Sequence, residues 1–514
     1  MTPSTLKEQK YHTLVLSKSN VTILLCLIIF IAAFLRLYYL STSSFSSDDM
    51  MSIEFIERND SIIKQTTNYG QPPFYFFILH YWTLLAGTSE FALRLPTAIF
   101  GILSVFVLFK LASLIFDNKT ALIGALLLAV NPEHLFPSFA LKQYTLTALL
   151  ALVSVYLLLR ALKECHTTLW IAFSISNIAL LCTHYSAIIV VLTELSYIAI
   201  VYRKYKYTLQ IFSATAVICL MVAALFFLQK EYVQAAPEYF QRIAKPTLET
   251  FLNVLSSFIA GFYIKIPERG IIFADAICFK SQGSYIDALP MPAKISIFAF
   301  FSIFLLLGIF KCFWRQTTSD EPRVTSDGCK PLIFIWATIP ILSAYAISFL
   351  LWPIFGPTKY HLFWSCSILL LIARGFAATG KLRFIYPILF IAVCIHLFPI
   401  LTKESNPRML NWKGVADYLR ENVSDGETVH FLSGNYGSLP LRYYYKEDVY
   451  IGVNKVFEKM TSSVNGGRSD GVFLIEAGES ALPVGWDRTL DMFYTNKDVK
   501  QFYHIDVTHY WNGR

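Results

Sequence analysis

The sequence has little charge for its length. Only 15% of its 514 residues are Asp, Glu, Lys or Arg, whereas soluble domains carry about 25%. Hydrophobic residues make up 55% of the chain and stand in long blocks. This composition excludes a disordered chain, a collagen and an ordinary cytosolic enzyme, and it predicts a polytopic membrane protein. The net charge of +8 does not indicate nucleic acid binding, because the basic residues lie between apolar blocks, where membrane topology accounts for them.

Cysteine is sparse and has no metal-binding or disulfide pattern. The nine cysteines include no C-x-x-C pair and no spacing with histidine that is typical of zinc ligands. Most of them lie inside or beside apolar blocks. A disulfide-stabilised scaffold is therefore excluded. The chain also lacks internal repeats and low-complexity tracts.

The apolar blocks are long enough to be membrane spans. A helix needs about 20 apolar residues to cross the hydrocarbon core. The fold class is therefore a polytopic α-helical membrane protein. The first run is longer than the core of a signal peptide, so we expect it to be retained. We count about 11 candidate spans, at residues 21–40, 92–116, 119–136, 143–162, 168–183, 185–202, 208–228, 294–314, 331–352, 361–378 and 384–402.

Lysine and arginine are distributed unevenly between the connections. If the N-terminus is cytoplasmic, basic residues concentrate in the cytoplasmic connections, and the short outer connections hold only Lys142 and Lys359. Cytoplasmic loops of membrane proteins carry such an excess of basic residues. We therefore expect a multi-pass protein of the inner (cytoplasmic) membrane. An odd number of spans then places the C-terminal tail outside, in the periplasm or its equivalent.

Two domains are predicted, residues 1–402 in the membrane and residues 403–514 outside it. The membrane domain has two long outer loops, at about 41–91 and 229–293. Residues 72–85 in the first loop are semi-apolar, which is typical of a helix lying at the interface. Residues 251–264 in the second loop are apolar but short, and we expect a re-entrant or surface helix there.

The tail has the charge content of a soluble domain and predicts a small α/β fold. Helical spacing of apolar residues covers 412–421, and Asn435, Gly437 and the pair Gly466–Gly467 indicate turns. Three short runs have the composition of strands, at 428–432, 449–453 and 472–475.

Two adjacent carboxylates, Asp48 and Asp49, follow the first span. Adjacent side chains point about 100° apart on a helix, so they cannot flank one substrate as a glycosidase pair does. One carboxylate could act as a general base while the other is oriented elsewhere. The simpler interpretation is a solvated acidic turn that caps a helix.

Other polar residues gather at the outer ends of the predicted spans. Lys142 and Lys359 lie on the side that disfavours cations, each shortly before a tyrosine, Tyr144 or Tyr360. Ionisable groups at the membrane edge are functional candidates, although a lysine that reaches towards lipid headgroups is the simpler interpretation. One carboxylate and several cations on one membrane face suit an anionic substrate carried by a lipid. Further candidates on this face are Gln71, Arg94, His134, His184 and Tyr185.

Several short sequence motifs occur one after another along nearly the whole chain. They are Asp48-Asp49, Gln71-Pro72-Pro73-Phe74-Tyr75, 89–96, Asn131-Pro132, Lys142-Gln143-Tyr144, Thr183-His184-Tyr185, Lys359-Tyr360 and 411–419. These motifs and their order resemble those of GT-C superfamily glycosyltransferases of the protein-O-mannosyltransferase and lipid A aminoarabinose transferase type. The family's first acidic residue corresponds to Asp48.

The resemblance implies inverting transfer of a sugar from a polyprenyl-phosphate donor of the undecaprenyl type. The acceptor would be a hydroxyl on a cell-envelope glycan, lipid or protein at the outer membrane face. A polyprenyl phosphate is already a competent leaving group, so one carboxylate base suffices, and cations offset the charge that grows on the phosphate. Some relatives bind a divalent metal. No set of histidines and carboxylates here matches such a site well enough to assign one, so a divalent metal stays open as a cofactor.

Two other functions stay open. A transporter or lipid flippase would favour broken spans and ionisable residues near the bilayer midplane, whereas the candidates here lie at one face. A catalytically inactive interaction protein on the same scaffold is the other alternative. Ala140 stands where the family has glutamate, and Lys142 and Lys359 stand where relatives have arginine.

Overall fold

The structure is a computed structural model of the 514-residue chain. The residues that it describes are 17–38, 40–41, 44–57, 62–68, 70–201, 246–260, 291–313, 326–350, 362–379, 411–432, 435–451, 471–477, 486–502 and 505–512.

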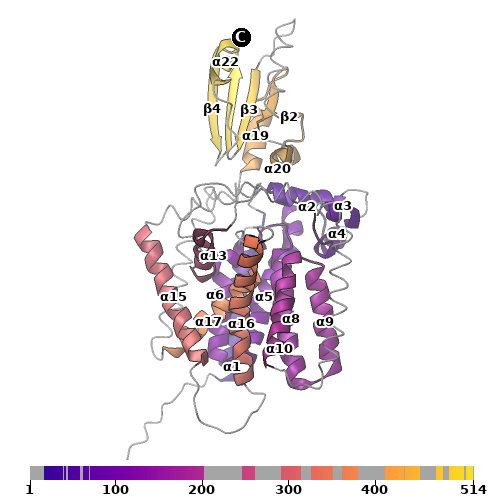
Figure 1. Ribbon diagram of the computed structural model, residues 1–514. Coiled ribbons are helices and arrows are strands. Elements are labelled where there is room, and N and C mark those ends of the chain that lie inside the picture. Colours follow the sequence, from indigo (N-terminus) through magenta and orange to yellow (C-terminus); the bar gives the residue numbers. More distant parts are fainter. Residues whose placement is uncertain are drawn as a thin grey trace, which may run out of the picture.

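Helices make up most of the described chain (Figure 1). Their length and apolar composition are those of a multi-pass helical membrane protein. Five helices are long and apolar enough to cross a membrane, and they fall within α1 (Lys18–Leu37), α5 (Glu90–Ile115), α8 (Tyr144–Glu164), α15 (Met291–Phe313) and α16 (Ser326–Leu350). Shorter apolar helices are α6 (Asn118–Val130), α9 (Thr167–Leu181), α10 (Ile188–Val201), α13 (Leu248–Ala260) and α17 (Leu362–Ala378).

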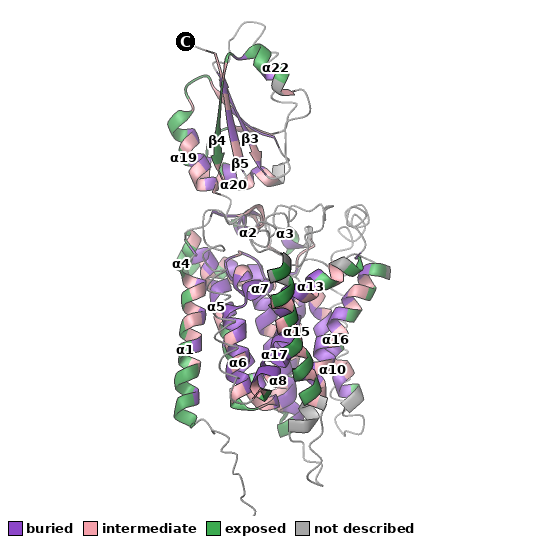
Figure 2. Ribbon diagram, turned by 90° about the vertical axis from the view of Figure 1, so that its left-hand side faces the viewer, coloured by how far each residue is buried: buried purple, intermediate pink, exposed green. Residues whose placement is uncertain are grey.

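Within the described ranges, nine of the predicted spans coincide with helices. The predicted spans 208–228 and 384–402 lie outside the described residues, so the count of about 11 remains a prediction. Helix α13 overlaps the short helix predicted at 251–264, and it buries Val254 and Phe258 among the bundle helices. Figure 2 colours the ribbon by burial, and the buried residues, in purple, run along the helices of the bundle.

Local signals set the ends of several helices. The Ser89 side chain accepts a hydrogen bond from the Ala92 N–H at 3.2 Å and so caps α5. Asp117 caps α6 through the N–H groups of Lys119 and Thr120. Such caps satisfy backbone donors that have no partner inside the helix.

Helices α15 and α17 approach each other closely because each has a glycine at the contact. A Cβ atom at Gly375 would overlap the backbone carbonyl of Phe304, and one at Gly308 would overlap that of Leu371. Small residues allow this close packing in membranes, where lipid is as apolar as a leucine side chain and does not drive helices together.

One carboxyl group is buried in the middle of the bundle. Glu194 of α10 accepts hydrogen bonds from the Ser154 hydroxyl of α8 at 2.6 Å and from the Asn177 amide of α9 at 3.1 Å. The expectation that ionisable residues avoid the middle of the spans is therefore wrong at Glu194. Both carboxyl oxygens bind neighbouring helices, so Glu194 links three helices.

Short helices lie between the bundle and the C-terminal sheet (Figure 1). We call this end of the bundle the outer end. Here α2 packs on α4, and α4 packs on α5. The elements at this end are α2 (Ser47–Glu57), α3 (Ile62–Asn68), α4 (Phe74–Ala86), α7 (Pro132–Leu135), and the 3₁₀ turns η1 (Phe136–Ser138) and η2 (Tyr185–Ala187).

The C-terminal part contains a mixed five-stranded sheet in the order β2-β1-β3-β5-β4. β1 pairs in parallel with β2 and β3, and β5 pairs antiparallel with β3 and β4. The strands are β1 (Thr428–Phe431), β2 (Val449–Ile451), β3 (Gly471–Ala477), β4 (Asn496–Phe502) and β5 (Ile505–Trp511).

Helices cover both faces of this sheet. α19 (Trp412–Asn422) and α20 (Asn435–Tyr445) share one apolar core with it, and α22 (Trp486–Phe493) shares another. The predicted helix and three strands are confirmed. The turn predicted at Asn435 and Gly437 is wrong, because burial of Leu441 and Tyr445 holds this segment as a helix. The predicted turn at Gly466–Gly467 lies outside the described residues.

Candidate active site

The first turn of α2 carries both candidate carboxylates. The Ser46 N–H donates to Asp49 Oδ2 at 3.0 Å, and the Asp49 N–H donates to Ser46 Oγ at 3.1 Å. This reciprocal pair is a capping box. It fixes Asp49 at the third position of the helix and leaves Asp48 one position earlier, on a different face.

Asp49 is buried and fully engaged with the protein. Besides the Ser46 bond, its Oδ2 lies 3.3 Å from Arg94 Nη2, and its Oδ1 accepts the Leu141 N–H at 2.6 Å. Asp49 therefore joins three segments: the loop after α1, helix α5 and the segment before α8. This environment suits a residue that holds the site together.

Arg94 is also buried, and it forms several contacts with the protein. Its guanidinium donates to the carbonyl oxygens of Leu40 at 3.2 Å and Ser44 at 3.0 Å. It lies 4.7 Å from the centroid of the Phe45 ring. With the Asp49 contact, these bonds make Arg94 the anchor of the loop that leads into α2. The sequence motif predicts substrate binding by Arg94, and the geometry shows this anchoring contact instead of an open cation.

Asp48 has a different environment. Its side chain is 29% exposed, and its Oδ1 lies 3.9 Å from Lys142 Nζ. The Lys142 side chain is only 4% exposed. The sulfur of Met51 lies 3.9 Å from the same Nζ. A partly exposed carboxylate thus stands beside a nearly buried cation.

Three consecutive residues before and at the start of α8 connect the outer elements. Lys142 faces Asp48 of α2. The Gln143 amide donates to Gln71 Oε1 at 2.6 Å, just before α4. The Tyr144 ring lies 6.1 Å from the His184 ring, centroid to centroid. We call residues 142–144 the hub segment, because its contacts bring five of the predicted site residues into one cluster.

The turn between α9 and α10 forms the other side of the cluster. His184 Nδ1 accepts the Ser186 N–H at 3.2 Å and lies 2.8 Å from Ser186 Oγ. Tyr185 begins η2 directly after it. The Phe74 N–H donates to the Cys182 carbonyl at 3.1 Å, which ties the start of α4 to this turn.

Two predicted substrate-binding residues, Lys359 and Tyr360, lie outside the described residues. His134 is buried within α7. In the part of the chain that the structure describes, no group of three or more His, Cys, Asp or Glu side chains could hold a metal ion. Near Asp48, the second carboxylate already accepts bonds from protein donors, so these residues do not fit a metal site.

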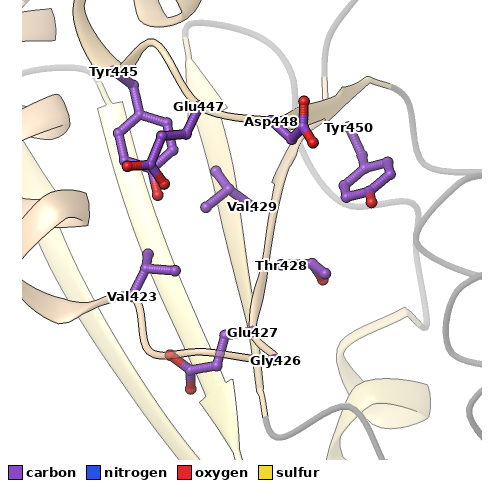
Figure 3. A pocket seen from close by; sticks show the side chains of 9 residues that line it. All are labelled: Val423, Gly426, Glu427, Thr428, Val429, Tyr445, Glu447, Asp448 and Tyr450. Carbon is purple, nitrogen blue, oxygen red and sulfur yellow. The ribbon is translucent and has the colours of Figure 1, made fainter. Parts of the chain in front are cut away.

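A separate hollow lies on the C-terminal sheet (Figure 3). Its volume is about 610 Å³, and it opens beside the first residues of β1 and β2. Of its carboxylates, Glu427 contacts His509 Nε2 at 2.9 Å and accepts the Ser424 N–H at 2.8 Å. Burial and the nearby Glu447 raise the pKa of Tyr445 to about 12, so its phenol stays neutral. Among the described residues that line this hollow there are acceptors but no lysine or arginine for a phosphate.

Ser46 was not singled out from the sequence, although its spacing from Asp49 is a recognisable signal. Ser46 stands three residues before Asp49, which is the spacing of a capping box. That pattern distinguishes the structural carboxylate from its neighbour. The Leu141 N–H, by contrast, has no sequence signal, because a backbone donor can belong to any residue.

The fold and the cluster define a helical membrane protein with a carboxylate–lysine pair at the outer end of its bundle. Residues 70–227 match the family described as dolichyl-phosphate-mannose-protein mannosyltransferase. This match confirms the resemblance to GT-C glycosyltransferases. The matched segment contains Gln71, Arg94, the hub segment and His184. No sequence among curated proteins matches the chain.

Several solved structures are similar in outline. The oligosaccharyltransferase of Archaeoglobus fulgidus in its apo form is 12% identical, with a TM-score of 0.48, over 90% of this chain and 70% of that chain. ArnT of Cupriavidus metallidurans in the apo state is 12% identical, with a TM-score of 0.44, over 95% of this chain and 98% of that chain. ArnT bound to undecaprenyl phosphate gives 12% identity and a TM-score of 0.44, over 96% of this chain and 98% of that chain.

Proposed function

We propose that this protein is an inverting glycosyltransferase that uses a polyprenyl-phosphate sugar as donor. The observation that carries the proposal is the pair formed by Asp48 and Lys142, with Asp49 fixed by other contacts. The pair offers a partly exposed base within 3.9 Å of a nearly buried cation. The family match over residues 70–227 supports the same reaction class.

In this mechanism Asp48 accepts the proton of an acceptor hydroxyl. The hydroxyl oxygen attacks the anomeric carbon from the face opposite the phosphate, and a new C–O bond forms. The bond between that carbon and the phosphate oxygen breaks, and the polyprenyl phosphate leaves with the electron pair. Lys142 offsets the negative charge that grows on the leaving group. Lysine does this as a point charge, without the two-pronged geometry of arginine.

We assign the remaining polar residues to substrate contacts. Lys359 would be a second cation for the phosphate, with Tyr360 beside it. Gln71, Tyr144, His184 and Tyr185 would line the sugar or the acceptor. Asp49 and Arg94 would act by positioning the loop that carries Asp48.

We also propose the cellular setting. The distribution of basic residues favours an N-terminus in the cytoplasm and an outer end that faces the periplasm or its equivalent. Residues 1–402 would then form the membrane domain and residues 403–514 the extracytoplasmic domain. The acceptor would be a glycan, lipid or protein of the cell envelope, lipopolysaccharide included.

A transporter is less well supported. Glu194 is the kind of residue that a proton-coupled transporter places within its spans. Both of its carboxyl oxygens are hydrogen-bonded to neighbouring helices, which accounts for it as a structural link.

The test is sugar transfer by the purified protein in lipid nanodiscs. Radiolabelled polyprenyl-phosphate sugars would be supplied with envelope extract as acceptor, and release of polyprenyl phosphate would be measured. Asp48→Asn keeps the shape of the side chain but removes its basicity, so turnover should fall by about 10²–10⁴-fold. Glu57→Gln is the matched control, because it makes the same change on an exposed residue of the same helix. Full turnover in the Asp48 variant would refute the assignment of the base.

A further inference from the structure

The C-terminal domain touches the loop that carries Asp48. The Phe45 N–H donates to the Tyr444 hydroxyl of α20 at 2.8 Å. The same hydroxyl donates to the Glu90 carboxylate at the start of α5. Tyr444 therefore connects three elements: the C-terminal domain, the loop before α2 and helix α5.

Lys413 of α19 makes a second connection at the same place. Its N–H donates to Ser44 Oγ at 3.1 Å. Its Nζ forms an ion pair with Glu90 and donates to the Ser41 carbonyl at 3.2 Å. The Glu90 side chain is 14% exposed, and that of Lys413 is 36% exposed. Two residues of the C-terminal domain thus share Glu90 as a partner and hold the same short loop.

Aromatic packing fills the space between these bonds. The Phe45 ring is fully buried. It lies 6.3 Å from the Tyr444 ring in a stacked arrangement and 5.5 Å from the Tyr443 ring edge-on. On the membrane side, the guanidinium of Arg94 contacts the same ring. Phe45 is therefore held from both sides, three residues before Asp48.

The chemistry of this contact suits a fixed link. Burial, and after it the hydrogen bond to the Glu90 carboxylate, raise the pKa of Tyr444 well above its ordinary value. The phenol therefore keeps its proton. Its oxygen can accept from the Phe45 N–H while its hydrogen goes to Glu90, so the direction of each bond is set.

We propose that Lys413 and Tyr444 are positioning residues, through which the C-terminal domain sets the geometry of Asp48. They act on Asp48 through Glu90 and through the loop at Ser44 and Phe45. This role rests on the proposed glycosyl transfer and adds to it that the C-terminal domain is part of the working site. A misplacement of a catalytic group by about 1 Å can lower a rate by about 10²-fold.

The test compares the full-length protein with two disruptive variants, Tyr444→Phe and Lys413→Ala. Tyr444→Phe removes only the hydroxyl oxygen, and Lys413→Arg is the conservative variant that keeps the charge. The matched controls are Tyr418→Phe, whose ring packs on the sheet against Phe473, and Lys500→Ala, on the exposed strand β4.

Two readouts are measured in nanodiscs. In the transfer assay, Tyr444→Phe and Lys413→Ala should lower kcat by roughly 5- to 50-fold and leave the KM for the donor unchanged, while Lys413→Arg restores most of kcat. Hydrogen exchange of residues 44–57 should be faster in both disruptive variants. Neither control should change either quantity.

The outcomes separate this proposal from the proposed function. Unchanged exchange at 44–57 in both disruptive variants would overturn the positioning role. Faster exchange with unchanged kcat would overturn it as well, because the contact would then only attach the domain. If the wild-type protein transfers no sugar, the proposed function fails, and the exchange comparison still decides whether the C-terminal domain orders the loop.

Discussion

The contrast between the two adjacent aspartates gives a sharp prediction for Asp49→Asn. The asparagine oxygen can still accept the Leu141 N–H. Its amide group, however, would face two donors, Arg94 Nη2 and the Ser46 N–H, where Asp49 Oδ2 now accepts from both. Arg94 would remain buried and would lose its contact with the Asp49 carboxylate. The substitution should therefore destabilise the protein.

The size of the effect follows from burial. Breaking a buried ion pair by removing one partner costs about 3–5 kcal/mol. With about 2 °C per kcal/mol, Tm should fall by roughly 6–10 °C. Asp48→Asn removes a longer contact from a side chain that is 29% exposed. The contact is 3.9 Å long, but the Lys142 side chain is only 4% exposed, so the Tm of Asp48→Asn should fall, and by less than the Tm of Asp49→Asn.

The assay is thermal unfolding of wild type, Asp48→Asn and Asp49→Asn in the same nanodiscs, with sugar transfer measured on each. Asp48→Asn should be inactive and more stable than Asp49→Asn. Asp49→Asn should be unstable, and at low temperature it should keep more transfer activity than Asp48→Asn. Equal Tm values for the two variants would refute the structural role of Asp49. The reverse pattern would mean that the two carboxylates have exchanged roles.

The remaining predictions concern the bundle and its orientation. Glu194→Gln should be nearly neutral, because the amide can accept from the asparagine partner and donate to the serine hydroxyl, whereas Glu194→Ala should cost roughly 1–3 kcal/mol in unfolding measurements; equal losses would contradict this. Gly375→Ala should cost about 1–3 kcal/mol, since the added Cβ meets the Phe304 carbonyl, and an unchanged Tm would argue against the close contact. In intact cells, a membrane-impermeant thiol reagent should label Cys278 and not Cys329; the opposite pattern would invert the topology.

The membrane part of the fold was largely predictable, because apolar runs of helical length are unambiguous. The C-terminal sheet was only partly predictable from the sequence. Strands β1 and β3 are mostly buried and read as apolar runs. Strand β4 is mostly exposed, with three lysine or aspartate residues among its seven. The conformation of β4 comes from its pairing with β5. Its sequence has no apolar pattern from which a strand could be predicted.

The sequence predicted several residues that lie together at the hub segment, but it did not predict their contacts. The adjacency of Asp48 and Asp49 predicts that they diverge. Which carboxylate is fixed depends on Arg94 and on the Leu141 N–H, which are 45 and 92 residues away from Asp49. The contact of Tyr444 with Phe45 could not be inferred, because the two residues are 399 positions apart in the sequence.

The hub segment limits how this site can change. Lys142, Gln143 and Tyr144 each face a different neighbour, and each can be replaced without moving the other two. A one-residue insertion or deletion just before them would have a larger effect. It would turn the start of α8 by about 100° and redirect all three side chains together. A point substitution in the hub segment therefore changes one contact at a time, whereas a change in its length would shift all three contacts together.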